Sequence, residues 1–123
     1  MKLQVVDHWL RAVNDGDAGR LVALTAERVE IVGPRGAGPA DREVLAEWLA
    51  RSGFSATSLR WFCGAGGEVV VEQQATWSAG GTARLASQFL VDGGRVTRYV
   101  RHDGGLEPAL AAAGLTPSDE VPA

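Results

Sequence analysis

Arg101 and Asp103, near the C-terminal end of the chain, are the residues whose types and spacing could carry acid–base chemistry. A carboxylate within reach of a substrate can accept or return a proton, and a guanidinium can stabilise a developing negative charge. Because Arg101 and Asp103 lie two positions apart on a predicted strand, their side chains point to the same face and can pair, while His102 points to the opposite face. Arg101 and Asp103 could therefore act together if this face lines a pocket. The same spacing also favours a structural ion pair at a rim, worth only about 0–1 kcal/mol when exposed.

Other catalytic centres and cofactor sites find no support in the sequence. The chain has two histidines and one cysteine, and their spacing matches no zinc site. A Gly-x-Ser-x-Gly elbow, which would indicate one type of serine hydrolase, does not occur. The glycine-rich run from Gly33 to Pro39 has the spacing of neither a phosphate-binding loop nor a dinucleotide fingerprint, so it predicts a turn. We expect no metal and no cofactor.

The composition is typical of one globular domain. The 123 residues are 46% apolar and 22% charged, which suits a single hydrophobic core. The formal net charge is −3 and the twelve Lys and Arg are scattered, so no basic stripe is offered to a nucleic acid or an anionic membrane. Asp7, His8 and Arg11 interrupt the first apolar stretch, and no window approaches the roughly 20 apolar residues of a membrane span. We expect a cytoplasmic protein with no nucleic-acid or membrane partner.

Three helices are predicted in the first half of the chain. Apolar residues at three- and four-residue steps indicate an amphipathic helix that ends at Asn14-Asp15-Gly16. Asp17 can cap a second helix from Ala18 to Leu24. A third helix is predicted from Asp41 to Ser52. Its predicted buried stripe consists of Val44, Leu45, Trp48 and Leu49.

A first strand is predicted at residues 28–32, before the third helix, and a run of four strands follows that helix. Alternating apolar and polar residues predict strands at 57–63, 68–78, 82–92 and 95–103. Paired glycines between these runs are a hairpin signal, so they form an antiparallel meander. A short helix at 106–114 is expected to dock through Leu106 and Leu110, which completes a domain over residues 1–115 with a flexible tail at 116–123.

Alternation divides the strand side chains between two faces. The face that should meet the helices is apolar except for Gln73 and Ser87, with Trp77, Leu85 and Phe89 among its members. A buried amide costs roughly 1–3 kcal/mol unless it is paired. Gln73 therefore either bonds to its neighbours or points into a wet cavity, and the pattern leaves both open. Tyr99, Arg101 and Asp103 share a face of the last strand, which is typical of a cavity lining and also of an edge strand.

The opposite, outer face of the sheet mixes aliphatic and arginine residues, which suits an isologous homodimer interface. Its predicted members are Arg84, Ala86, Gln88, Leu90, Val96, Arg98, Val100 and His102.

The order of elements resembles the nuclear transport factor 2-like superfamily, which includes ketosteroid isomerases and SnoaL-like polyketide cyclases. The resemblance spans about Met1 to Asp103 and is carried by the run Asn14-Asp15-Gly16-Asp17, the segment Glu27–Pro34 and the closing Gly94–Tyr99. It implies an α+β, cystatin-like cone in which three N-terminal helices pack on a curved antiparallel sheet, followed by a short C-terminal helix. The ligand would lie between the helices and the concave sheet.

The resemblance argues against ketosteroid isomerase chemistry in this chain. The general-base aspartate of those enzymes falls on Ile31, their oxyanion-binding tyrosine on Trp9, and their protonated aspartate on Ser87. Ile31 cannot accept a proton, and the carboxylate pair tuned for that reaction is missing.

SnoaL-like cyclases use an acid or base carboxylate or histidine late in the meander, so the resemblance makes Asp103, with Arg101, the candidate catalytic residues. Arg–Asp pairs also occur in limonene epoxide hydrolase-like members of the superfamily. Their mechanism needs a second aspartate on a neighbouring strand, where the inward positions here offer only Gln73 and Ser87.

The sequence thus predicts a small-molecule-binding domain for an apolar or aromatic ligand, with an isomerase-, cyclase- or hydrolase-type activity left open. The alternative is a non-catalytic homodimeric assembly module. The predicted ligand-contacting residues are Trp9, Ile31, Gln73, Trp77, Leu85, Ser87, Phe89 and Tyr99.

Overall fold

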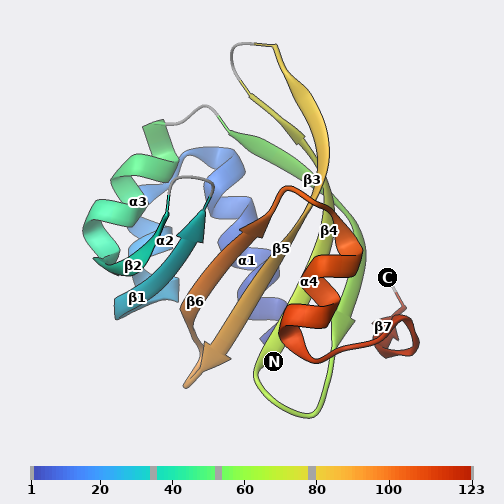
Figure 1. The fold of residues 1–123 in the computed structure, drawn as a ribbon. Helices are drawn as coiled ribbons and strands as arrows, with labels where there is room; N and C mark the ends of the chain where they lie inside the picture. The colour runs from blue at the N-terminus through green and yellow to red at the C-terminus, as the bar shows by residue number, and fades with distance from the viewer. Residues whose placement is uncertain (1, 34–35, 52–53, 78–79, 123) are drawn as a thin grey trace.

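The chain begins with two helices, α1 (Lys2–Asp15) and α2 (Ala18–Leu24), in a computed structural model that describes residues 2–33, 36–51, 54–77 and 80–122 (Figure 1). Helix α2 starts where the sequence predicts, because the Asp17 side chain accepts a hydrogen bond from the Arg20 backbone N–H at 3.1 Å. No helix of the described ranges is long and apolar enough to cross a lipid bilayer.

One curved sheet of seven strands forms the body of the described molecule. The strands lie in the order β2-β1-β6-β5-β4-β3-β7. Neighbours pair antiparallel except β1 and β6, which are parallel. The predicted meander is confirmed. The strands are β1 (Thr25–Gly33), β2 (Gly36–Asp41), β3 (Ser55–Cys63), β4 (Glu68–Thr76), β5 (Thr82–Asp92), β6 (Arg95–His102) and β7 (Glu120–Val121).

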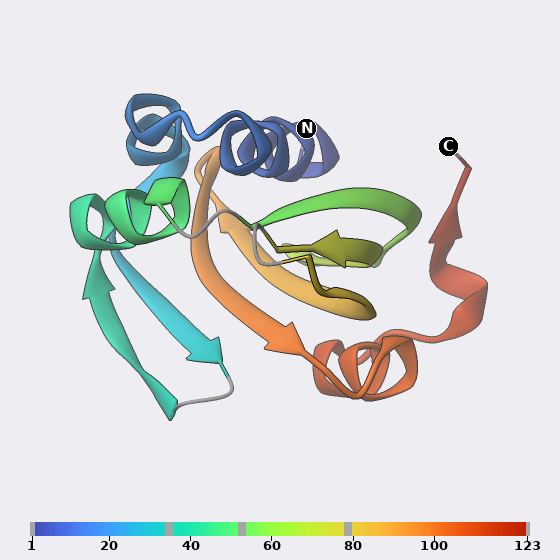
Figure 2. The ribbon, with the colours of Figure 1, turned by 90° about the horizontal axis from the view of Figure 1, so that it is seen from above.

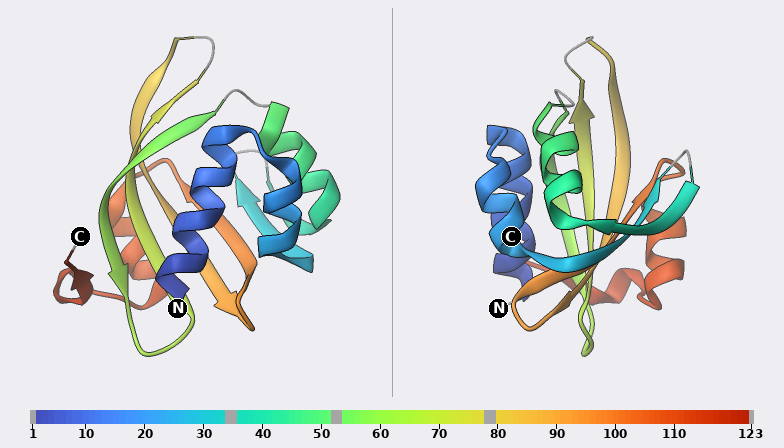
Figure 3. Two further views of the ribbon diagram at one scale, coloured as in Figure 1. Left: turned by 180° about the vertical axis from the view of Figure 1, so that it is seen from behind. Right: turned by 90° about the vertical axis from the view of Figure 1, so that its left-hand side faces the viewer.

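Helices cover both faces of this sheet. Helices α1, α2 and α3 (Arg42–Arg51) lie against the concave face, which curves around them, and α4 (Leu106–Ala113) lies against the opposite face (Figure 2). The described part is therefore an α+β fold with four α-helices and a seven-stranded curved sheet. The β4–β5 hairpin extends beyond the helical layer, where Thr82, Ala83 and Arg84 are exposed (Figure 3).

The main core fills the space between α1–α3 and the concave face. Trp9, Leu21, Val71 and Phe89 are each at most 1% exposed there. A second, smaller core lies under α4. It consists of Phe62, Val70, Ala86, Ala109 and Leu110, with Leu106, Ala113 and Leu115 at its margin. The predicted docking of this helix through Leu106 and Leu110 is thus confirmed, and Gly114 ends it in the left-handed conformation at φ 71°.

The C-terminal segment lies along the edge of β3. Residues Pro117–Asp119 form a 3₁₀ turn, and β7 then pairs with Trp61 and Phe62. Arg60 holds the segment through two hydrogen bonds to the Glu120 carboxylate, at 3.2 and 2.8 Å. This is the stretch that the sequence assigns to a flexible tail.

The glycine-rich run predicted as a turn contains strand β2. Gly38 and Pro39 pair with Ile31 and Glu30 of β1. Glycine and proline disfavour strands, but β2 is the edge of the sheet, where proline needs no inward-facing donor. Pairing with β1 therefore overrides the local preference.

The predicted buried stripe of the third helix is half wrong. Leu45 and Leu49 are buried, together with Ala46, but Val44 is 61% exposed and Trp48 is 55% exposed. The buried face is centred one residue further along the helix than the largest side chains suggest. Contacts with α2 and β1, rather than side-chain size, decide which face of α3 turns inward.

A β-bulge overturns the outward assignment of Val96. Leu90 pairs with Arg98 but Val91 pairs with Val96, so β6 carries one extra residue, Thr97, at this point. The Thr97 hydroxyl donates to the Leu90 carbonyl at 3.1 Å. The extra residue reverses the alternation, and Val96 is fully buried in the main core.

Candidate functional site

A diagonal line of polar side chains crosses the concave face. It consists of Gln73 on β4, Ser87 on β5 and Tyr99 on β6, which are 0%, 1% and 6% exposed. Gln73 lies opposite Leu85, Ser87 opposite Arg101, and Tyr99 opposite Phe89, so each polar residue is the diagonal neighbour of the next. All three belong to the face that alternation predicts to be inward.

The middle residue of the line orients the first. Ser87 Oγ donates to Gln73 Oε1 at 2.6 Å, and both atoms are buried. This bond uses the carbonyl end of the amide and leaves its Nε2 group free. Gln73 Nε2 is buried and has no hydrogen-bond partner in the described part of the molecule. An unpaired buried donor is uncommon and calls for an explanation.

Tyr99 remains a neutral hydrogen-bonding group. Burial raises the pKa of its hydroxyl above 10, and the hydrogen bond with Ser87 opposes this shift less strongly. Along this line, the Ser87–Gln73 bond leaves one buried donor unpaired among the described residues, Gln73 Nε2.

Aromatic rings surround this line. The Trp9 ring lies 5.2 Å from that of Phe89 and 5.1 Å from that of Tyr99. The Trp9 indole N–H donates to Thr25 Oγ1 at 2.9 Å, and Thr25 in turn donates to the Leu21 carbonyl at 2.6 Å. The indole N–H is thus already engaged, and Trp9 contributes only an apolar ring to the concave face.

Arg101 and Asp103 pair with each other at the end of β6. Their ion pair is 2.8 Å long, and the side chains are 22% and 51% exposed. The Arg101 guanidinium lies 5.4 Å from the centroid of the Trp77 ring, which also contacts Phe54 edge-on at 5.5 Å. These residues form a half-exposed rim beside the buried line.

The remaining predicted ligand-contacting residues lie on the same face. Leu85 is buried at 1% exposure beside Gln73, and Ile31 is partly buried beside Tyr99. The structure thus brings all the predicted site residues to the concave face or its rim. Sequence reasoning missed Thr25 and Phe54. Thr25 follows α2, where its hydroxyl can reach back four residues, and that position was the only available signal.

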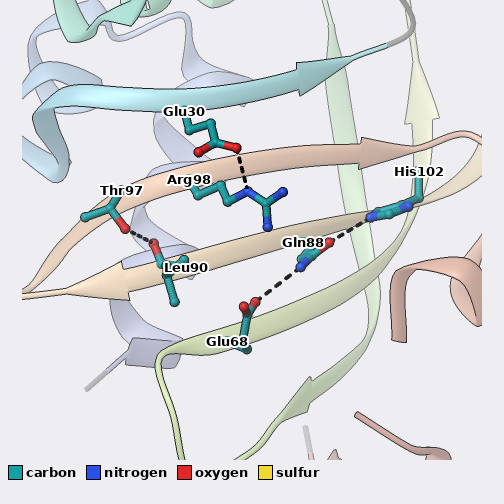
Figure 4. A network of polar contacts seen from close by, with 7 residues as sticks. All are labelled: Glu30, Glu68, Gln88, Leu90, Thr97, Arg98 and His102. Carbon is teal, nitrogen blue, oxygen red and sulfur yellow. Dashed lines mark hydrogen bonds and ion pairs between the residues drawn. The ribbon is translucent and has the colours of Figure 1, made fainter. Parts of the chain in front are cut away.

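A different polar network lies on the outer face (Figure 4). Gln88 Nε2 donates to Glu68 Oε2 at 3.4 Å, and Gln88 Oε1 lies 2.9 Å from His102 Nε2. Partial burial, followed by the charge of Arg98, lowers the pKa of His102 below 6.5. The neutral ring can then donate its Nε2 proton to Gln88. Arg98 is paired with Glu30 at 3.2 Å.

Surface grooves of the described residues lie next to strand β7. A groove of about 320 Å³ is lined by residues 59–61 and 120–122, and another of about 250 Å³ lies between α1 and residues 61, 121 and 122. Both lie beside β7, away from the line of Gln73, Ser87 and Tyr99. No group of three or more His, Cys, Asp or Glu side chains is arranged to hold a metal ion in the described ranges.

Solved structures share this architecture. One is a protein of unknown function from Cytophaga hutchinsonii, with a TM-score of 0.76 at 15% identity over 83% of this chain and 88% of that one. The chain adopts the NTF2-like, cystatin-like fold. A candidate polyketide cyclase from Sinorhizobium meliloti matches with a TM-score of 0.69 at 17% identity, over 80% of this chain and 94% of that one. A computationally designed 17-OHP binder matches with a TM-score of 0.65 at 21% identity, over 80% and 88%.

No protein-family model matches the sequence, and no curated protein matches it either. At identities of this size the likeness establishes the NTF2-like fold, and the functions named for the similar structures remain theirs.

Proposed function

We propose that this NTF2-like chain binds a small apolar or aromatic molecule on the concave face, in the cytoplasm. The observation that carries the proposal is the Gln73 Nε2 group, which is buried without a partner in the described structure among apolar side chains. Small-molecule sites combine a mostly apolar lining with a few polar groups that orient the ligand. The candidate cyclase and the designed binder support it by analogy of fold only.

The binding free energy would come chiefly from apolar contact. Phe89, Leu85 and the Trp9 ring are apolar groups packed beside the polar line, so the surface removed from water would be that of the ligand. Each square ångström of apolar surface removed from water contributes roughly 25 cal/mol. The polar line then fixes the orientation of the ligand.

We assign no reaction to this site. Asp103, the predicted acid or base, is held by Arg101 and is half exposed at the rim, so it lies at the entrance to the proposed site. If turnover is found, the expected requirement is for Asp103, with Arg101 as its partner, and Asp103→Asn would abolish the turnover while leaving binding intact.

Amide-resolved spectra of the isotope-labelled protein, titrated with progesterone, α-tetralone and an anthraquinone, test the proposal. We expect at least one compound to give saturable shifts at Gln73, Ser87 and Tyr99 and to raise the melting temperature. Gln88 and His102, on the outer face of the same sheet, serve as internal controls whose signals should stay in place. Saturable shifts confined to the outer face, or none with any compound, would contradict it.

A second candidate function is homodimeric assembly through the outer face. It is favoured by Leu90 and Arg98, which remain partly exposed on this face, although α4 already covers Val70 and Ala86. Light scattering at micromolar concentration should give twice the chain mass, and Arg98→Glu should return the mass to that of a monomer. Arg20→Glu on α2 is the matched control, and a monomeric wild type would refute the assembly.

A further inference from the structure

The hydrogen bonding of Gln73 determines which end of its side-chain amide is free, and this bears on the chemistry of the ligand. The Ser87 hydroxyl donates to Gln73 Oε1 and so holds the carbonyl end of the amide. The free Nε2 end carries two hydrogens and has no lone pair to offer. Whatever completes this site must therefore accept a hydrogen bond.

The described backbone around Gln73 does not supply that acceptor. Gln73 lies in the middle of β4, paired with Ser58 of β3 on one side and Leu85 of β5 on the other. None of the described carbonyls near it accepts a hydrogen bond from Gln73 Nε2. The acceptor must come from outside the sheet, on the side of the helices.

The surrounding charges argue against an obligatory anion. The nearest cation on the same face of the last strand, Arg101, is already paired with Asp103 at 2.8 Å. Burial keeps Tyr99 neutral, so the polar line of Gln73, Ser87 and Tyr99 itself carries no charge. A neutral oxygen acceptor on an otherwise apolar molecule satisfies this arrangement without bringing an uncompensated charge into the core.

We propose that the ligand carries a carbonyl oxygen, as in a ketone or quinone, and that this oxygen accepts a hydrogen bond from Gln73 Nε2. This proposal rests on the proposed binding function and adds to it the polar group by which the ligand is recognised. Ser87 acts as a positioning residue, because it orients the amide.

A matched pair of probes tests the carbonyl proposal separately from the binding function. α-Tetralone and tetralin have the same bicyclic skeleton and differ in one carbonyl group. Since an intramolecular hydrogen bond contributes about 0.5–1.5 kcal/mol net, we expect α-tetralone to bind roughly 3- to 10-fold more tightly than tetralin to the wild type. Calorimetry or amide-shift titration measures both dissociation constants.

Three variants complete the test. Gln73→Leu should remove the preference for the ketone, Ser87→Ala should reduce it, and Gln74→Leu should retain it. Gln74 is the matched control because it is the neighbouring residue of β4 and lies on the opposite face. If Gln73→Leu does not fold, the Gln73 side-chain amide signal of the wild type decides, because it should move with α-tetralone and stay in place with tetralin.

The outcomes are distinct. Equal binding of both probes, or a preference that Gln73→Leu retains, overturns the carbonyl proposal and leaves the binding function standing. Failure of both probes, together with the steroid and the anthraquinone, overturns both. A ketone preference that disappears only in Gln73→Leu and weakens in Ser87→Ala supports both.

Discussion

Two glutamines on neighbouring strands make the clearest contrast in the molecule. Gln73 on β4 and Gln88 on β5 are 0% and 1% exposed, and they lie on opposite faces of the sheet. Gln88 uses both ends of its amide, with Glu68 at one end and His102 at the other. Gln73 uses only its oxygen, and its nitrogen is unpaired among the described residues.

The difference separates a structural polar group from a candidate binding group. A buried amide that is satisfied at both ends stabilises one arrangement of its neighbours and has nothing left for a ligand. A buried amide with a spare donor carries a cost of roughly 1–3 kcal/mol that a bound acceptor can relieve. Equal burial and equal chemistry thus lead to different roles, and only the partners distinguish them.

Removing each glutamine in turn is the strongest test of this contrast. Gln88→Leu should lower the free energy of unfolding by about 1–3 kcal/mol, because Glu68 and His102 lose their shared partner. Gln73→Leu should change the free energy of unfolding by less than about 1 kcal/mol, or increase it. The substitution loses the bond to Ser87 but also removes an unpaired buried donor. Urea unfolding of both variants measures the difference. A cost for Gln73→Leu equal to that of Gln88→Leu would remove the distinction.

The inner face should next be visible in the titration of Tyr99, the only tyrosine in the chain. Burial raises its pKa above 10, so the stability it contributes is complete below pH 10 and is lost as the pH rises through the folded-state value. Tyrosinate absorbance should begin to rise at higher pH in the native protein than in urea. Tyr99→Phe should lose this part of the alkaline destabilisation. If the pKa of Tyr99 were 10 both in the native protein and in urea, Tyr99 would not be buried as described.

The outer face should respond to acid through His102. Its pKa is lowered by partial burial and by Arg98, so protonation favours the unfolded chain. The stability that His102 contributes is present above pH 6.5 and is lost as the pH falls below that value. His102→Gln, which keeps a donor for Gln88, should flatten the dependence of the unfolding free energy on pH in this window. A slope that His102→Gln leaves unchanged would contradict this role of His102.

The rim should matter least for stability. Asp103→Asn breaks the pair with Arg101, but Asp103 is 51% exposed, so we expect a loss of only about 0–1 kcal/mol that shrinks further in high salt. Urea unfolding at low and high ionic strength measures it. A larger, salt-independent loss would place this pair in the buried part of the site.

The sequence by itself determined which residues face the helices along most of the meander. Side chains alternate on a strand whatever the fold, so Gln73, Leu85, Ser87, Phe89 and Tyr99 could be assigned to one face from their spacing alone. The glycine pairs fixed where the hairpins turn, and β5 has the bounds predicted for it.

Tertiary structure decided whatever depends on partners distant in the sequence. One extra residue at Thr97 turned Val96 inward, and pairing with β1 made a strand of the glycine run. No local pattern announces either feature, because both arise from the register between strands.

The polar partners were likewise beyond the sequence. Thr25 engages the Trp9 indole, and Ser87 holds one end of Gln73 while nothing in the described structure holds the other. Alternation could place Gln73 on the inner face, but it could not say whether the amide would be satisfied there. That depends on hydrogen-bond geometry between neighbouring strands, which exists only after the sheet has formed.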